Sequence, residues 1–322
     1  MPERIALEFE RPIIDLEKKI AEMRALSGSS QIELDDEIFR LEKKANKLRK
    51  DVYSSLTRWQ KTQLARHPDR PYTLDYVKRI FDQFVELHGD RAFADDPAIV
   101  TGLGKIDETS VIVIGHQKGR GTKDNLYRNF GMPNPEGYRK AKRIMALAEK
   151  FHRPIIAFID TPGAYPGLGA EERGQAEAIA TNLMVMAKLP VPYIAVVIGE
   201  GGSGGALAIS VADRIYMLEN SIYSVITPEG CASILYRDAS HAPKAAEAMK
   251  ITAKDLAGLK LIDGLIDEPL GGAHRDPDFV AGKIKEMLLS ALDELKSVPV
   301  DELIAKRHQR YFDVGVWSEV KK

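Results

Sequence analysis

The sequence predicts an α/β fold in which two strands and then a helix recur, as in ββα units wound into a spiral. Two strand-like runs, 98–106 and 111–117, flank a short polar turn. Further along the chain, apolar strands are expected at 155–159 and 193–198, and each precedes a helical segment. Strands that precede helices twice in succession favour parallel pairing with right-handed crossovers. Two strands before each helix distinguish this pattern from a simple alternating βα fold.

Local signals place the helices. Thr73 is suited to cap a helix that continues to about Leu87. Pro135 opens another helix, which ends near Phe151, because proline is tolerated at the first helical position. Further helices are expected at 170–189, 204–211 and 278–295.

The first 65 residues differ from the rest of the chain. Apolar residues recur three and four positions apart with charged residues between them, which indicates two amphipathic helices separated near 27–30. We expect a helical hairpin over 1–65 that serves as a docking arm, on the body or on a partner. Helix-breaking residues at 66–71 form a linker. The main domain is then 72–296, and a helical tail occupies 297–322.

Composition excludes several classes of protein. The chain has 46 basic and 47 acidic residues, for a net charge of −1, so no charge excess indicates a nucleic-acid or membrane surface. Its one cysteine, Cys231, excludes an internal disulfide and a cysteine-rich zinc site in this chain. The sequence has no signal-peptide pattern and no apolar run of the ~18–20 residues that span a bilayer. We expect a cytoplasmic protein without a metal site of its own.

The most informative segment is 199–205, where five glycines fall in seven positions between an apolar β-branched run and a small-residue helical run. Glycine costs roughly 0.5–1 kcal/mol relative to alanine inside regular structure, so this cluster implies close approach to the backbone. Amides at a helix start lack intrahelical acceptors and favour negative charge nearby. The segment therefore predicts a site for an anion, and three interpretations compete.

The first interpretation is a dinucleotide site. Gly199, Gly201 and Gly204 match the GxGxxG fingerprint, and Glu219 stands near the distance expected of its acidic residue. Such a match arises easily by chance in a loop this rich in glycine.

The second interpretation is a serine hydrolase, because Ser203 lies in a GxSxG pattern. A nucleophilic serine needs an acid and a histidine downstream. The chain offers Asp238, Asp263, His241 and His274. The elbow is a tight strand–serine–helix turn, however, whereas here the strand is expected to end at Gly199, four residues too early.

The third interpretation is a pocket of backbone amides without a side-chain nucleophile. Gly204, Gly205 and Ala206 provide closely spaced amides, and a second glycine–proline loop, 160–167, follows the preceding strand. Both loops are expected at the carboxyl ends of parallel strands, where open α/β sheets place their sites. Two such loops on successive strands form a more specific signal than either alone.

Longer motifs surround these loops. They are 115–120 (GHQKGR), 129–133 (NFGMP), 160–167 (DTPGAYPG), 170–175 (AEERGQ), 199–206 (GEGGSGGA), 224–232 (SVITPEGCA) and 268–275 (EPLGGAHR). Together they resemble the family of alpha subunits of the bacterial acetyl-CoA carboxylase carboxyltransferases.

The resemblance implies a crotonase-like (ClpP/crotonase) ββα superhelix, which agrees with the strand pattern. It also implies transfer of the carboxyl group from carboxybiotin, held by the biotin carboxyl carrier protein, to acetyl-CoA, forming malonyl-CoA for fatty-acid synthesis. The biotin is not attached to this chain. The implied partners are a carboxyltransferase beta subunit in an α2β2 assembly, the carrier protein and biotin carboxylase. In many bacteria the beta subunit carries a four-cysteine zinc domain, so the lone Cys231 suits the alpha role.

The resemblance also implies residue roles. Gly204 and Gly205 are implied to hold the ureido oxygen of biotin, and a pair in the beta subunit holds the acetyl oxygen. We expect Gly163 and Ala164 to form a second wall or donor. No protein general base is needed, because a biotin nitrogen takes the proton from the acetyl methyl. The remaining alternative is that the chain is only a scaffold for the beta subunit.

Other residues are expected to line the substrate path. Gly201 and Gly202 belong to the same loop, and Tyr165 either lines the biotin groove or lies in the core. Lys118 and Arg120 either attract a carboxylate or a phosphate of coenzyme A, or belong to an exposed basic loop. Glu200, His116 and His274 are expected to have structural roles.

Overall fold

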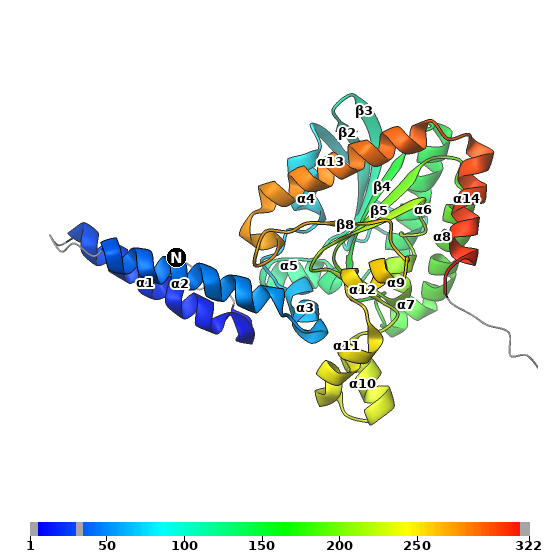
Figure 1. Cartoon of the computed structure of the whole chain (residues 1–322). Helices are drawn as coiled ribbons and strands as arrows, with labels where there is room; N and C mark the ends of the chain where they lie inside the picture. Colours follow the sequence, from blue (N-terminus) through cyan, green and yellow to red (C-terminus); the bar gives the residue numbers. More distant parts are fainter. Residues whose placement is uncertain (1–5, 30–34, 316–322) are drawn as a thin grey trace, which may run out of the picture.

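The computed structural model describes residues 6–29 and 35–315 (Figure 1). It contains one eight-stranded sheet with the order β1-β2-β3-β4-β5-β6-β8, and β7 pairs with β5 off this path. The pairs β1–β2 and β2–β3 are antiparallel, and the strands from β3 onward pair in parallel. The strands are β1 (Gln83–Glu86), β2 (Ile99–Ile106), β3 (Thr109–His116), β4 (Ile155–Thr161), β5 (Tyr193–Gly202), β6 (Arg214–Leu218), β7 (Ile222–Ser224) and β8 (Gly264–Ile266).

Helices cover both faces of this sheet (Figure 1). The α-helices are α1 (Arg11–Ser29), α2 (Asp35–Ser54), α3 (Arg58–Ala65), α4 (Thr73–Ile80), α5 (Gly121–Tyr127), α6 (Pro135–Lys150), α7 (Leu168–Glu172), α8 (Gln175–Lys188), α9 (Ser203–Leu207), α10 (Pro228–Tyr236), α11 (Ala242–Met249), α12 (Ala253–Gly258), α13 (Pro277–Lys296) and α14 (Val300–Phe312). Short 3-10 turns are η1 (Glu8–Glu10), η2 (Asn129–Gly131), η3 (Ala239–His241) and η4 (Ala273–Arg275).

The central strands are buried on both faces. Every residue of β4 and β5 is buried, as expected of parallel strands between two helical layers. Along β4, Ile155 and Ala157 face a core shared with α6 and α8, whereas Ile156 and Phe158 face a core shared with α4 and α13. This alternation follows from the two-residue period of a strand. The buried sheet holds the carboxyl ends of β4 and β5 side by side.

The predicted ββα rhythm is confirmed, and three predicted helices differ. The helix expected to reach Leu87 ends at Ile80, because residues 83–86 pair with β2 and form β1 instead. The helix expected at 170–189 divides into α7 and α8 at Gly174, whose φ of 82° is left-handed. The helix expected at 204–211 is only α9, and it ends at Leu207.

The first two helices form a hairpin that projects from the body (Figure 1). Arg49 pairs with Glu17, and Arg24 pairs with Glu42, across the two helices. Near the body, Ile13 is fully buried. The predicted hairpin is therefore present, and its docking role stays a prediction.

The C-terminal helix α14 is fixed to the body. Arg307 is buried and forms two hydrogen bonds with Asp213, of 2.8 and 2.7 Å. Its remaining N–H groups donate to the carbonyls of Met186, Leu189 and Val191. In the described ranges no helix combines the length and the apolar character needed to cross a membrane.

Candidate functional site

Two loops meet at the carboxyl ends of β4 and β5. The strands are parallel neighbours, with Thr161 opposite Gly201. A Cβ atom on Gly205 would lie 2.5 Å from the amide nitrogen of Ala164 and 2.5 Å from the carbonyl carbon of Gly163. The backbones of the two glycine loops are therefore in direct contact. The prediction that the loops lie at the ends of adjacent parallel strands is confirmed.

Four of the five glycines at 199–205 have no room for a side chain. A Cβ atom would lie 2.2–2.7 Å from a neighbouring atom in each case: Asp160 Oδ1 for Gly199, the Tyr223 ring for Gly201, the Pro162 carbonyl oxygen for Gly202, and the second loop for Gly205. Distances this short require the neighbour to move. Packing within this chain thus accounts for these four glycines.

Gly204 is the exception. The nearest atoms to a Cβ at this position would be the Ile179 methyl groups, at 3.7 Å, which is ordinary van der Waals contact. Gly204 is partly exposed, whereas Gly205 is buried. An alanine in a helix is more stable than a glycine by about 0.5–1 kcal/mol. The described chain therefore has room for a Cβ atom at this position, and the glycine leaves space for a group from outside it.

The amides at this point are available for hydrogen bonding. Gly204 and Gly205 lie in the first turn of α9, where no intrahelical acceptor exists. Among the described residues, neither amide donates to a loop carbonyl or to a side chain. The amide of Gly163 differs, since it donates to Thr161 Oγ1 at 3.1 Å. Of the two roles expected for Gly163, only that of a wall is compatible with this hydrogen bond.

Ser203 stands at the junction of strand and helix. The expectation that the strand ends at Gly199 is wrong, because residues 200–202 pair with β7 and extend β5 to Gly202. Ser203 follows directly, with a left-handed φ of 56°. Spacing alone therefore no longer argues against a nucleophile elbow.

The partners of a nucleophilic serine are absent from the described surroundings of Ser203. Each candidate makes other contacts: Asp238 caps η3, Asp263 pairs with Arg310, His241 packs against Tyr236, and His274 stacks on His67. Without a general base beside the hydroxyl, the arrangement does not support a serine nucleophile.

The dinucleotide interpretation also lacks its structural context. Gly199 and Gly201 lie within β5 rather than in a loop between strand and helix. The fingerprint requires its glycines in that loop, where they can approach a pyrophosphate. Glu219 does directly follow β6, and its amide donates to the carbonyl of Ile266.

His116 contacts the backbone of the glycine loop 199–205. It is fully buried, and its Nε2 lies 3.2 Å from the carbonyl oxygen of Gly205. Because a carbonyl oxygen only accepts, Nε2 carries the hydrogen. Burial lowers the pKa of His116 to about 3, so the ring is neutral at physiological pH. This agrees with the structural role expected for it.

Lys118 belongs to an ion pair next to the loop. Its Nζ lies 2.6 Å from Oδ1 of Asp160, and its side chain is 15% exposed. The same carboxylate oxygen accepts the backbone amide of Glu200 at 3.0 Å. This hydrogen bond joins β4 to β5 where their ladder shifts register, between Ile159 and Thr161. Lys118 therefore lies inside the site and is already paired.

Arg120 remains half exposed. It donates to Asp75 at 2.8 Å and to the Arg70 carbonyl at 3.1 Å, and its guanidinium lies over the Tyr72 ring at 4.5 Å. Tyr165 is also exposed, so of its two expected positions the one in the core is wrong. Its ring covers Gly167, where a Cβ would lie 2.3 Å from the ring.

The linker contributes two arginines that the sequence did not single out. Arg66 donates to Glu200 at 2.7 Å and to Glu229 at 2.6 Å. Arg70 is buried; it donates to both carboxylate oxygens of Glu268, at 2.8 and 2.7 Å, and to the carbonyl of Ile198. Both arginines thus fix the end of β5. The sequence offered one signal for their role, namely two arginines four positions apart in a segment of helix-breaking residues.

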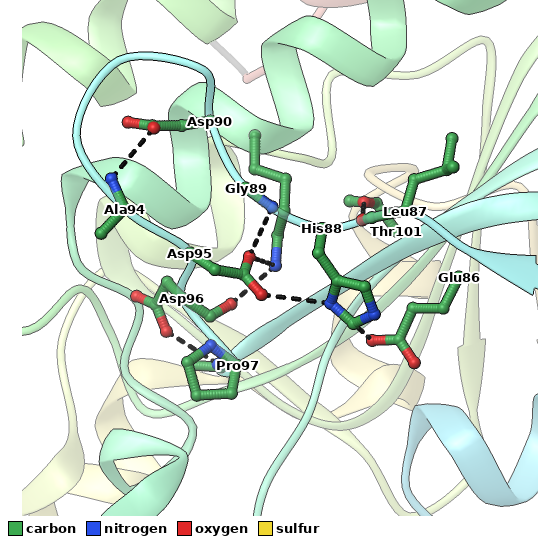
Figure 2. Close-up of polar contacts among 12 residues, drawn as sticks. Glu86, Leu87, His88, Gly89, Asp90, Ala94, Asp95, Asp96, Pro97 and Thr101 are labelled. Carbon is green, nitrogen blue, oxygen red and sulfur yellow. Dashed lines mark hydrogen bonds and ion pairs between the residues drawn. The ribbon is translucent and has the colours of Figure 1, made fainter.

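A second polar cluster lies in the loop between β1 and β2 (Figure 2). His88 Nδ1 contacts Asp95 at 3.1 Å, and Asp95 also accepts the Gly89 amide. Burial alone would raise the pKa of Asp95, but hydrogen bonds from Lys140 and Gly89 lower it to about 2. Asp90 accepts three successive amides of its own loop. These contacts hold the loop in place and, through Lys140, join it to α6.

Metal binding has no support in the described ranges, which hold no group of three or more His, Cys, Asp or Glu side chains that could bind an ion.

Comparisons with known proteins agree with the geometry. A sequence profile of the family described as acetyl co-enzyme A carboxylase carboxyltransferase-like matches residues 6–315. The chain is 57% identical over 319 residues to the acetyl-coenzyme A carboxylase carboxyl transferase subunit alpha of Geobacter metallireducens, covering 99% of this chain and 100% of that protein. It is 56% identical to the subunit of the same name from Thermus thermophilus, covering 97% and 99%.

Solved structures share the fold at low identity. The transcarboxylase 12S structure has a TM-score of 0.58 at 20% identity and covers 71% of this chain, which spans 42% of that one. The hetero-tetrameric malonate decarboxylase of Pseudomonas in complex with coenzyme A has a TM-score of 0.55 at 18% identity, covering 66% and 85%. The fold is thus the crotonase-like one that the resemblance implied.

Proposed function

Because this chain belongs to the family of alpha subunits of acetyl-CoA carboxylase carboxyltransferase, we propose that it forms one half of a carboxyltransferase site. The reaction moves the carboxyl group of carboxybiotin to acetyl-CoA and yields malonyl-CoA, the precursor for fatty-acid synthesis. Gly204 carries this proposal, because its open side-chain position beside unpartnered amides fits an oxygen that approaches from outside the chain.

The chain's own contribution is electrostatic. Carboxybiotin, when bound, supplies the carboxyl group and a nitrogen that takes the proton from the acetyl methyl. The amides of Gly204 and Gly205 donate to the ureido oxygen, on which negative charge concentrates as the carboxyl group leaves. A fixed donor of this kind contributes about 2.7–4 kcal/mol to the transition state. The reaction therefore needs no general base from this chain, in keeping with the neutral, buried His116.

The second loop forms the opposite wall. Ala164 lies against Gly205, and Gly163 lies beside Ser203. Tyr165 is exposed at the same loop and is suited to cover one side of the biotin ring. Gly201 and Gly202 act indirectly, since they let Tyr223 and Pro162 approach and so shape the loop.

Lys118 and Arg120 have different proposed roles. Arg120 is paired with Asp75 but keeps half of its side chain exposed, so its free face is suited to meet an anionic group of coenzyme A. Lys118 is neutralised by Asp160 and acts through that carboxylate rather than by direct contact with the substrate.

The proposed partners follow from the proposal that this chain provides only one half of the carboxyltransferase site. The acetyl oxygen needs its own amide donors, which a carboxyltransferase beta subunit would supply in an α2β2 assembly. The biotin carboxyl carrier protein delivers the carboxyl group that biotin carboxylase loads. The hairpin of α1 and α2, within the proposed arm 1–65, is suited to dock on such a partner. The body, 72–296, carries the site, and α14, within the proposed tail 297–322, packs against it. We place this assembly in the cytoplasm.

Reconstitution tests the proposal. The purified chain is mixed with its beta subunit, and malonyl-CoA formation from acetyl-CoA and carboxybiotin is measured. We expect turnover only when both chains are present. Turnover by the beta subunit alone would make this chain a scaffold, and hydrolysis of simple esters by this chain alone would favour Ser203 as a nucleophile.

A further inference from the structure

We propose that Arg66 is a positioning residue that keeps the glycine loop electrostatically neutral by pairing with Glu200. The inference depends on the proposed function for the place of the oxyanion, and it adds a residue that lies outside both glycine loops.

Two carboxylates are buried at the point where the loops meet. Asp160 ends β4, and Glu200 lies between Gly199 and Gly201 in β5. The amide of Glu200 donates to Asp160, so the two acidic residues are adjacent. A negative charge that forms on an oxygen at Gly204 would be repelled by both. The repulsion is strong because water is largely excluded from both carboxylates.

Each carboxylate has one cation of its own. Lys118 neutralises Asp160, at 2.6 Å. Arg66 donates to Glu200 Oε1 through Nε at 3.0 Å and through Nη2 at 2.7 Å. With both pairs intact, these two carboxylates and their two cations carry no net charge among themselves. Arg66 also holds Glu229, whose side chain is 39% exposed and therefore partly screened by water.

Arg66 reaches the loop from a separate element. It caps the C-terminus of α3, the helix that follows the hairpin. At the other end of α3, Arg58 pairs with Glu247 at 2.9 Å and with Asp255 at 2.6 Å. These two arginines anchor the same helix with the same number of carboxylates, but only Arg66 meets the glycine loop. Arg58 is thus a matched control for loss of helix docking.

The test compares four variants in the complex with the beta subunit: Arg66→Met, Glu200→Gln, the double variant, and Arg58→Met. Arg66→Met should lower kcat on the order of tenfold to a hundredfold, the effect of one unpaired charge within about a nanometre at an effective dielectric constant of about 20. The KM for acetyl-CoA should stay within about threefold, because ground-state binding is unchanged. Arg58→Met should keep wild-type kcat, and Glu200→Gln alone should not lower it, because that change removes a negative charge from the site.

The double variant is decisive. It removes the cation and the charge together, so it should recover most of the activity lost in Arg66→Met, and it remains informative if Arg66→Met alone does not fold. Failure of the folded double variant to regain activity would overturn the proposal, as would equal losses in Arg58→Met and Arg66→Met. An inactive wild-type complex would instead contradict the proposed function, so the two failures are distinguishable.

Discussion

The carboxylate of Asp160 occupies the space that a side chain on Gly199 would need. A Cβ at Gly199 would lie 2.5 Å from Asp160 Oδ1. That oxygen accepts the amide of Glu200 and the ammonium of Lys118. The glycine therefore serves an ion pair that joins β4 to β5, and it is not a sign of a bound phosphate.

Gly199→Ala should destabilise the protein without touching the site directly. The added methyl group must displace a buried, paired carboxylate, which we expect to cost about 1–3 kcal/mol. Urea denaturation measures this loss. Gly282→Ala is the control, because Gly282 lies in α13 with open space around it, and this change should stabilise by about 0.5–1 kcal/mol. Equal stability of the two variants would show that Asp160 moves freely.

Ser203→Ala should leave both stability and carboxyl transfer near the wild-type values. No hydrogen bond from the Ser203 hydroxyl is found in the described part of the chain, and the candidate histidines His241 and His274 contact other aromatic rings instead. We expect a change in unfolding free energy within about 0.5 kcal/mol, as for most substitutions that remove no contact. Complete loss of transfer in a folded variant would favour a nucleophilic serine.

His116 predicts a pH dependence of stability. Burial lowers the pKa of His116 to about 3 in the folded state, from 6.5. Below pH 6.5 the unfolded chain therefore binds a proton that the folded chain does not. Folding stability should fall as pH drops from about 6.5 towards 3, by on the order of 1.4 kcal/mol for each pH unit from this residue.

The matching variant is His116→Gln, whose amide nitrogen can still donate to Gly205. Urea denaturation at pH 7 and at pH 5 should show a smaller loss of stability for this variant than for the wild type. Identical losses in the two proteins would mean that His116 becomes protonated in the folded state.

Arg70→Met should be the most damaging of the linker substitutions for stability. It leaves Glu268 buried without its cation, and breaking such a pair costs about 3–5 kcal/mol. Arg70→Met combined with Glu268→Gln should recover part of this loss, because the second change removes the unpaired charge. Thermal unfolding should therefore give a lower midpoint temperature for Arg70→Met than for the double variant. A lower midpoint for the double variant would contradict this prediction.

The sequence predicted the parts of the site that depend on local pattern. The β-branched runs at 155–159 and 193–198 specify buried parallel strands, and the glycine-rich segments after them specify loops. The loops had to meet, because adjacent parallel strands end at the same edge of the sheet. Each of those loops is one continuous stretch of sequence, so the family motifs within them could be recognised without the structure.

Other features depend on contacts between distant segments. The sequence predicts residues 83–86 as the end of a helix, whereas in the structure they pair with β2 and form a strand. The pairing of Arg66 with Glu200 spans 134 positions, and no local pattern indicates it. The glycines of 199–205 likewise look equivalent in sequence. Only the positions of Tyr223, Pro162 and Asp160 distinguish the four that packing requires from Gly204.

The most direct test of the account is carboxyl transfer by Gly204→Val in complex with the beta subunit. The fold has room for a Cβ atom there, so the free energy of unfolding should change by no more than about 1 kcal/mol. The side chain would enter the space proposed for the ureido oxygen, and transfer should fall by about a hundredfold to a thousandfold. Gly258→Val, at an exposed glycine with open space around it, should keep full activity. A folded Gly204→Val complex that transfers the carboxyl group at the wild-type rate would contradict the account.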